Sequence, residues 1–200
     1  MQKDNGISKR VRAATHVATR TLRLLLLGSF AMTTPLFSQS GTAMDHYEQT
    51  QAPPELVQAV RTATQKYTDV NAAINAGYHP VLGCVSGPDH GAMGVHYLNA
   101  SLLNGEVEAT QPQALIYEPL GGGKMRLVGV EFIVDEATWG KKNSAPPQLY
   151  QQLFQLIPRP NRYGLDTFYE LHVWAWQDNP NGAFVDWNNK VNCNLQGTTL

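Results

Sequence analysis

The sequence has no apolar run long enough to cross a lipid bilayer. Its longest largely apolar stretch, residues 24–37, has about 14 residues, whereas a membrane-spanning helix needs about 20. Basic residues precede this stretch, and the small residues Ser40 and Ala43 follow it. This order is typical of a secretion signal, so we expect residues 1–43 to be a signal peptide and processing region that meets the membrane only transiently. An uncleaved anchor is the alternative, and no adjacent arginine pair indicates twin-arginine export.

Charge is also scarce, at 16% of residues, and the chain has no internal repeat or low-complexity tract. With 42% hydrophobic residues, the composition is typical of a folded globular protein, and we expect residues 44–200 to form a single domain. Six of the 15 basic residues and one of the 16 acidic residues lie in positions 1–40, which leaves nine basic and 15 acidic residues for the rest. An acidic body repels phosphate backbones, so we expect no nucleic-acid partner.

Cysteine is rare, because the chain contains only Cys84 and Cys193. In a chain expected to reach an oxidising compartment, secreted or periplasmic, an even pair favours a disulfide. A bond that closes a loop of roughly 100 residues stabilises a fold by at most about 4–5 kcal/mol in the chain-entropy model. Two free thiols, one of them a metal ligand, are the alternative.

Hydrophobic periodicity predicts two helices. Apolar residues recur at spacings of three and four over residues 55–76, after a proline pair that fits a helix start and before Gly77, which fits a helix end. A short helix is expected over residues 146–157, where three leucines share one side. Strand-type patterns occupy residues 95–99, 114–118, 126–134 and 167–176. The predicted fold class is α+β: one long N-terminal helix and one short helix pack on a curved antiparallel sheet, whose closure into a barrel stays open as an alternative.

Several catalytic motifs are missing. The glycine run 121–123 lies between two expected strands and not before a helix, so it predicts a hairpin turn rather than a phosphate-binding loop. Ser86 lacks the sequence pattern of a nucleophile elbow. His96 is followed by Tyr97 and Leu98, whereas the first cupin motif has two histidines one residue apart. We therefore expect neither a serine hydrolase nor a cupin, although another kind of sheet can carry a metal site.

The expected strands do carry ionisable residues on faces that are otherwise apolar. Side chains alternate between the two faces of a strand, so each strand divides into an apolar face and a mixed one. The mixed faces hold His96, Glu118, Glu131, Glu170 and His172. An unpartnered buried charge costs several kcal/mol, so we expect these side chains to be one another's partners in a sheltered pocket.

We predict that His96, Glu131 and His172 converge and bind a divalent transition metal. Two imidazoles and one carboxylate suit zinc with an open coordination position, or iron, manganese or copper. Glu118 and Glu170 would then orient the imidazoles or carry protons in catalysis, and a small molecule would bind at the open position. The convergence depends on strand register, because a shift of one residue moves a side chain to the other face.

Two other functions fit the same residues. One is the binding of a small apolar or aromatic ligand in a pocket lined by Phe168, Trp174 and Trp176. The other is a structural role in the cell envelope, with the ionisable groups in a satisfied buried network. Asp89 and His90, in a glycine-rich loop, are weaker candidates for a pocket cap or a further ligand, because a simple turn is the favoured explanation for them. The sequence does not decide whether the protein is an enzyme.

Four segments resemble a family of uncharacterised exported bacterial proteins. They are residues 91–97 (GAMGVHY), 114–119 (ALIYEP), 127–132 (LVGVEF) and 169–174 (YELHVW). The similarity spans about residues 55–194 and includes both cysteines. The resemblance implies export and a bacterial source, and it implies no particular reaction.

Overall fold

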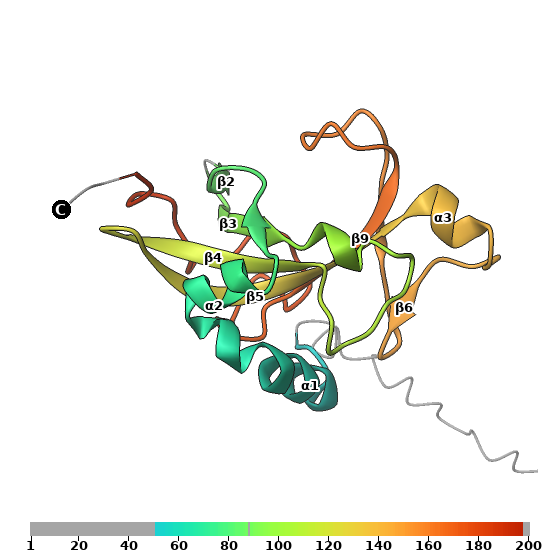
Figure 1. Cartoon of the computed structure of the whole chain (residues 1–200), viewed down its shortest axis with the longest axis horizontal. Coiled ribbons are helices and arrows are strands. Elements are labelled where there is room, and N and C mark those ends of the chain that lie inside the picture. Colours follow the sequence, from blue (N-terminus) through green and yellow to red (C-terminus); the bar gives the residue numbers. More distant parts are fainter. Residues whose placement is uncertain (1–50, 88, 198–200) are drawn as a thin grey trace, which may run out of the picture. The chain divides into compact units, whose positions relative to one another are not determined.

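The structure is a computed structural model that describes residues 51–87 and 89–197. The predicted signal peptide and processing region, residues 1–43, lies outside the described residues. Three helical segments come first, and the strands follow with two short helices between them (Figure 1): α1 (Pro54–Thr64), η1 (Gln65–Thr68), α2 (Val70–Asn75), β1 (His79–Pro80), β2 (Val85–Gly87), β3 (Gly91–Leu98), η2 (Ala100–Leu102), β4 (Ala114–Gly121), β5 (Lys124–Asp135), α3 (Glu136–Gly140), β6 (Gln148–Leu149), β7 (Gln152–Leu153), β8 (Gln155–Ile157) and β9 (Phe168–Val173). Within the described ranges, no helix is both long and apolar enough to cross a membrane.

One antiparallel sheet dominates the fold. Its strands follow the order β1-β3-β4-β5-β9-β8, and β2 also pairs with β3. The predicted α+β class with a mainly antiparallel sheet is therefore confirmed. The sheet is not closed into a barrel, because its edge strands β1 and β8 are not paired with each other in the described part of the chain. The glycines at 121–123 form the hairpin turn between β4 and β5 with positive φ angles, which glycine adopts without strain.

The predicted long helix over residues 55–76 is wrong, because the chain divides there into α1, η1 and α2. At the end of α1 the buried Thr64 hydroxyl donates to the Val60 carbonyl at 2.7 Å, a local bond that competes with regular helix continuation. Asp69 then adopts an extended conformation, and its carboxylate accepts a 2.9 Å hydrogen bond from the Asn71 N–H. This cap starts a new helix, so α1 is the longest helix among the described residues.

The short helix predicted over residues 146–157 is also wrong. The segment instead folds into the β6–β7 hairpin and then pairs with β9 as β8. The two turn residues, Tyr150 and Gln151, have φ angles of 49° and 68°, which are typical of a tight two-residue hairpin turn. A short helix does occur earlier, at α3, where the Asp135 carboxylate caps the N–H of Thr138 at 2.7 Å.

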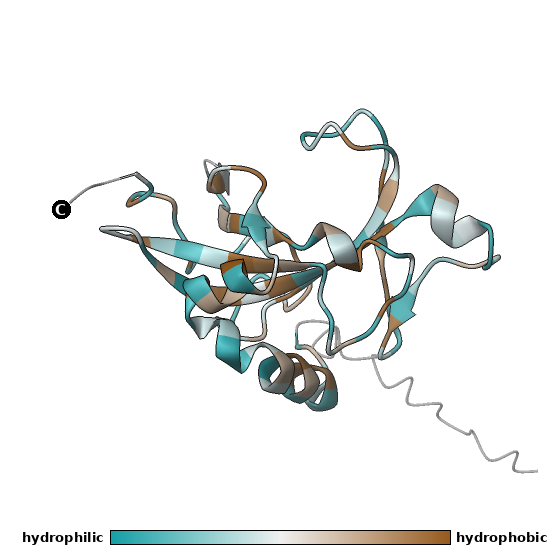
Figure 2. Cartoon of the chain, viewed as in Figure 1, coloured by the Kyte–Doolittle hydropathy of each residue, from teal (hydrophilic) through white to brown (hydrophobic). Residues whose placement is uncertain are grey.

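Different parts of the chain cover the two faces of the sheet. Figure 1 shows α1 and α2 on one face, and the large core beneath them includes Leu56, Val60, Leu115, Val130 and Phe132. Figure 2 shows apolar residues concentrated in the middle of β4 and β5 and polar ones toward the turn that joins them. The opposite face carries a smaller core of Ala92, Ile116, Val128, Trp174 and Val191.

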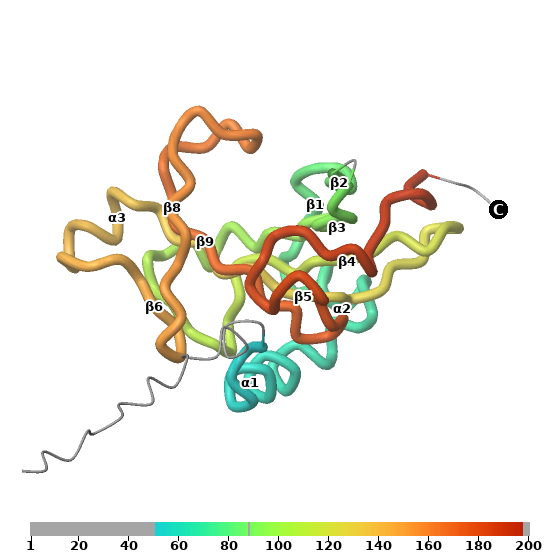
Figure 3. Tube along the Cα trace, turned by 180° about the vertical axis from the view of Figure 1, so that it is seen from behind, coloured from blue at the N-terminus to red at the C-terminus, as the bar shows by residue number. Residues whose placement is uncertain are grey.

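The C-terminal segment, residues 177–197, crosses this second face, as Figure 3 shows from behind. The backbones of Asn188 and Ala92 exchange two hydrogen bonds of 3.1 Å. The disulfide predicted between Cys84 and Cys193 is present, with Cα atoms 5.5 Å apart. It fixes the end of the C-terminal segment to the start of β2, beside the sheet face on which the ionisable residues lie.

Candidate metal site

Three strands bring His96, Glu131 and His172 together on the second face of the sheet. Glu131 on β5 lies directly opposite His172 on β9. His96 lies on β3, so β4 separates it from Glu131 and presents Ile116 opposite His96 and Ala114 opposite Glu131. Ala114 is fully buried, and its side chain is a single methyl group. The two longer side chains therefore meet above it.

The donor atoms have the spacing of metal ligands. His96 Nε2 lies 3.4 Å from Glu131 Oε2 and 3.4 Å from His172 Nε2. One donor atom from each of the three residues lies within 4.8 Å of the others. Ligands bound at about 2.1 Å to a tetrahedral zinc ion are about 3.4 Å from one another. The three side chains are thus close enough to share one cation.

The cluster is buried, yet it is not fully hydrogen-bonded. His96, Glu131 and His172 are exposed by only 2%, 2% and 1%. Most buried polar atoms in proteins have a hydrogen-bond partner, but the Nδ1 atoms of His96 and His172 and the Oε2 atom of Glu170 have none within the part of the chain described. These atoms are therefore available to contact a further group.

Burial keeps both imidazoles uncharged. It lowers the pKa of His96 to about 3, with smaller contributions from His172 and Arg162. It lowers the pKa of His172 to about 4. Both rings are therefore neutral at neutral pH and can offer a nitrogen lone pair to a cation.

Burial shifts the pKa of the neighbouring carboxyl groups in the opposite direction, upward. Burial raises the pKa of Glu131 well above its ordinary value, and Glu170 and Asp186 raise it further through their charges. Burial also raises the pKa of Glu170 to about 7, although its hydrogen bond with Glu131 acts to lower it. The two carboxyl groups therefore share a proton near neutral pH, and a cation would displace that proton.

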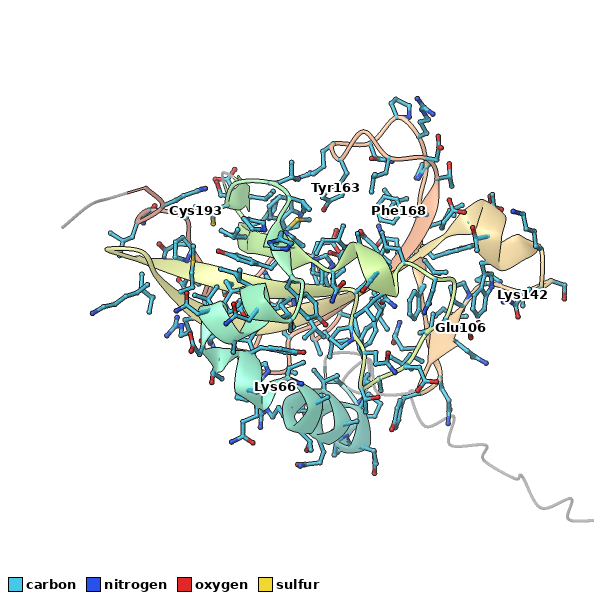
Figure 4. The ribbon with its side chains drawn as sticks, in the orientation of Figure 1. Lys66, Glu106, Lys142, Tyr163, Phe168 and Cys193 are labelled. Carbon is cyan, nitrogen blue, oxygen red and sulfur yellow. A yellow bond between two sulfur atoms is a disulfide. The ribbon has the colours of Figure 1, made fainter. Side chains whose placement is uncertain are left out.

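A cavity of about 110 Å³ opens beside His96 and Glu131. Its walls are mainly apolar and include Val81, Leu98, Ile133, Leu165 and Phe168. Tyr163, on the loop between β8 and β9, closes one side, with its ring edge-on to His96 at 6.4 Å and to Phe168 at 5.8 Å between centroids. Figure 4 shows Tyr163 and Phe168 on the same side of the sheet.

A second cavity, of about 130 Å³, lies next to the same cluster. Glu170, His172 and Asp186 line it, together with the polar residues Gln152 and Gln155. The two cavities share no lining residue. The ionisable cluster therefore separates an apolar hollow from a polar one.

Of the three aromatic residues predicted to line the ligand pocket, Phe168 lines the apolar cavity and the two tryptophans do not. Trp174 lies on the second face but packs in the smaller core, with its ring stacked on His172 at 6.3 Å between centroids. Trp176 lies on the opposite, helix-covered face, where its indole N–H donates to the Thr64 hydroxyl at 3.0 Å.

The end of β9 explains where the tryptophans lie. The strand stops at Val173, and the N–H of Ala175 bonds back to the Val173 carbonyl at 2.8 Å. This three-residue turn ends the alternation of a strand. The sequence predicted a strand that continues to residue 176, which would place Trp174 and Trp176 on the same face. That prediction is corrected, because β9 ends at Val173.

Glu118 does not reach the cluster, so its predicted catalytic role is corrected. One of its oxygens accepts hydrogen bonds from the backbone N–H and side-chain amide of Asn192, at 3.1 and 2.9 Å. The other oxygen pairs with Arg126. Because Glu118 is only 3% exposed, these partners compensate for its burial, and the residue holds the C-terminal segment on the sheet.

Two residues at the cluster escaped the sequence analysis. The first is Asp186, whose Oδ1 lies 3.5 Å from His172 Nδ1, and the second is Tyr163. Both belong to irregular segments, where no alternation of faces predicts the direction of a side chain. Asp89 and His90 are exposed and line a different, open hollow beside Trp187, so they do not join the cluster.

Comparison with models of protein families, with curated proteins and with solved structures finds no match to this chain.

Proposed function

We propose that the protein is an exported metal-binding protein in which His96, Glu131 and His172 hold a divalent transition metal ion. One observation supports this proposal most strongly: Glu131 Oε2 and His172 Nε2 each lie 3.4 Å from His96 Nε2, in a buried cluster where neighbouring buried polar atoms lack hydrogen-bond partners among the described residues. A purely structural network would satisfy those atoms, because each unsatisfied one costs about 1–3 kcal/mol.

The donor set narrows the choice of metal. Two neutral imidazoles and one carboxylate suit zinc, iron, manganese or copper rather than calcium or magnesium, which prefer oxygen ligands. Three protein ligands leave at least one coordination position open. The apolar cavity beside His96 and Glu131 is where that position would be reached.

An open position next to a cavity supports a catalytic role as well as binding. A metal held there would polarise a substrate or lower the pKa of a bound water. Glu170 would serve as the proton carrier, because it hydrogen-bonds Glu131 and its pKa is raised to about 7, close to the value that suits a general base. The substrate would be a small molecule, since a cavity of about 110 Å³ is smaller than the ~150 Å³ that accommodates benzene.

The disulfide supports export. Cys84 and Cys193 are bonded, and such bonds persist mainly in oxidising compartments. A secreted or periplasmic location agrees with this bond and with the expected signal peptide. The compartment is tested by fractionating cells and locating the oxidised chain with a thiol-alkylating gel shift, and a reduced cytoplasmic chain would contradict the proposed export.

Metal analysis of the purified, oxidised protein tests the metal site. After incubation with Zn²⁺, Fe²⁺, Mn²⁺ or Cu²⁺ and desalting, elemental analysis should find at least one ion per chain. His172→Ala should abolish binding, and His96→Asn should lose an ion. His90→Ala is the matched control, because His90 is exposed and outside the cluster. Wild-type protein that retains its fold but holds no metal would refute the proposal.

The apolar walls of the cavity favour a second candidate, a binding module for a small apolar ligand. Trp174 discriminates the two functions, because its ring stacks on His172. Stoichiometric Cu²⁺ should quench its fluorescence if His172 binds metal, and Trp174→Phe should remove most of that quenching. Fluorescence that responds to small apolar molecules but not to Cu²⁺ would favour the binding module.

A further inference from the structure

His172 faces two groups of potential ligands at once. Its Nε2 atom lies 3.4 Å from His96 Nε2, in the cluster described above. Its Nδ1 atom lies 3.5 Å from Asp186 Oδ1. Glu170, His172 and Asp186 form a second set whose ligand atoms all lie within 4.8 Å of one another.

Two further observations indicate that this second set binds a ligand. Glu170 Oε2 and His172 Nδ1 are buried and have no hydrogen-bond partner among the residues described, although Glu170 and His172 are exposed by only 2% and 1%. Both residues and Asp186 also line the polar cavity of about 130 Å³, which has room for an ion and its water ligands. The apolar cavity lies beside the other set and has different walls.

We propose that Glu170, His172 and Asp186 form a second divalent-cation site, and that the ring of His172 bridges the two ions. The bridge rests on the proposed function, since it requires an ion at His96 and Glu131. The second site has one imidazole nitrogen and two carboxylates, a set that also suits zinc or copper. With an ion bound there, Glu170 is a ligand, and it would act as the proton carrier only while the second site is empty.

The charges of the two sites balance. A neutral imidazole has one N–H and one lone pair, so coordination at both nitrogens requires His172 to release its ring proton to solvent. The resulting imidazolate and the carboxylates of Glu131, Glu170 and Asp186 carry four negative charges, which match two divalent cations. A buried site with no net charge avoids the desolvation cost that one unpaired ion would impose.

A simpler role for Asp186 makes a different prediction. A carboxylate beside a metal-bound imidazole often accepts the ring N–H and orients the ring. In that case the protein holds a single ion, and Asp186 is a positioning residue. The number of ions and their mutual interaction therefore decide between the two arrangements.

Copper titration followed by electron paramagnetic resonance tests the bridge in the oxidised protein. The Cu²⁺ signal should rise up to the first equivalent and fall toward zero with the second, because an imidazolate couples the two unpaired electrons. Asp186→Asn should bind one Cu²⁺ with an isolated, full-intensity signal. His96→Asn should also retain one isolated ion, at the second site. Asp178→Asn is the matched control, because Asp178 lies in the same segment but is exposed and paired with Lys190.

Each other outcome overturns the proposal in a distinct way. If the wild type and Asp186→Asn each bind one ion, the first site is still supported and the second site is refuted. Two ions with additive signals would eliminate the bridge. No bound copper in folded wild-type protein would refute both this proposal and the proposed function. Circular dichroism of each variant confirms that the comparison is made between folded proteins.

Discussion

The two faces of the sheet differ in how completely their buried polar groups are hydrogen-bonded. On the helix-covered face, the Tyr78 hydroxyl donates to the Pro112 carbonyl at 2.8 Å and the Tyr117 hydroxyl to the Tyr67 carbonyl at 2.6 Å. On the opposite face, three buried side-chain atoms of the ionisable cluster have no partner in the described ranges. The same chain thus satisfies polar groups where they serve packing and leaves them unsatisfied in one place. That contrast supports the proposed binding site.

The helix-covered face should contribute most to stability, independently of metal. Phe132 is fully buried there, beside Phe154. Phe132→Ala should reduce the free energy of unfolding by about 3–5 kcal/mol, measured by urea denaturation with metal and with chelator. The difference between the two conditions should stay as in wild type. Loss of that difference would show that the faces are not independent, and Leu156→Ala, at an exposed position, is the control.

A single methyl group should decide whether the metal ligands meet. Ala114→Leu would place a larger side chain between His96 and Glu131, so metal binding should be lost and the free energy of unfolding should fall by about 1–3 kcal/mol. Ala114→Gly should keep the metal and cost about 0.5–1 kcal/mol. Isothermal titration calorimetry with Zn²⁺ measures both. Unchanged affinity in Ala114→Leu would show that the two ligands do not need the space above β4.

The metal-free protein should lose stability above about pH 7. The unfolded chain takes up protons on His96 and His172 that the folded chain does not, so stability rises from about pH 4 to the ordinary histidine pKa of about 6.5. Folded Glu170 keeps its proton up to about pH 7, and burial raises the pKa of Glu131 well above its ordinary value, so the stability that these protons contribute is lost from about pH 4.5 upward. The gain from the histidines is nearly complete by about pH 7, whereas the loss from the carboxyl groups continues above it.

The fall between about pH 7 and pH 8 should be on the order of 1 kcal/mol, and Glu170→Gln should reduce it, because it removes one of these protons and a charge that raises the pKa of Glu131. Saturating metal should also reduce it, because the cation replaces the shared proton. Thermal unfolding across this pH range, with and without chelator, measures the effect. A metal-free protein whose stability rises over the same range would contradict the assigned protonation of the cluster.

The central strands and three residues of the candidate site were predictable because the alternation of side chains between the two faces of a strand can be recognised within a short stretch of sequence. His96, Glu131 and His172 each interrupt an apolar pattern, and knowledge of the face alone placed them on the correct side. The strand register that brings them together was not predictable, nor was the small residue Ala114 that lies between His96 and Glu131 on the intervening strand. Glu170 was predictable in the same way, whereas the hydrogen bonds of Glu118 come from a distant segment.

The failed helix predictions have a common physical cause. Leucines spaced three and four apart in residues 146–157 suit one side of a helix, but residues 155–157 instead form β8 and pair with β9. Over residues 55–76 the apolar pattern continues through Asp69, although the Asp69 side chain caps a new helix. Periodicity reports which residues are buried, and tertiary pairing and local caps decide the backbone that buries them.

The disulfide has a consequence for the order in which the protein matures. Asp186 lies in the segment after β9, which has no helix or longer strand among its described residues, and this segment is attached near its end by Cys193. Asp186 therefore joins the donor set only after the chain has been synthesised beyond β9, and the disulfide then holds its segment beside the sheet. In the proposed export, the second ion would be loaded after translocation, in the compartment in which the protein works.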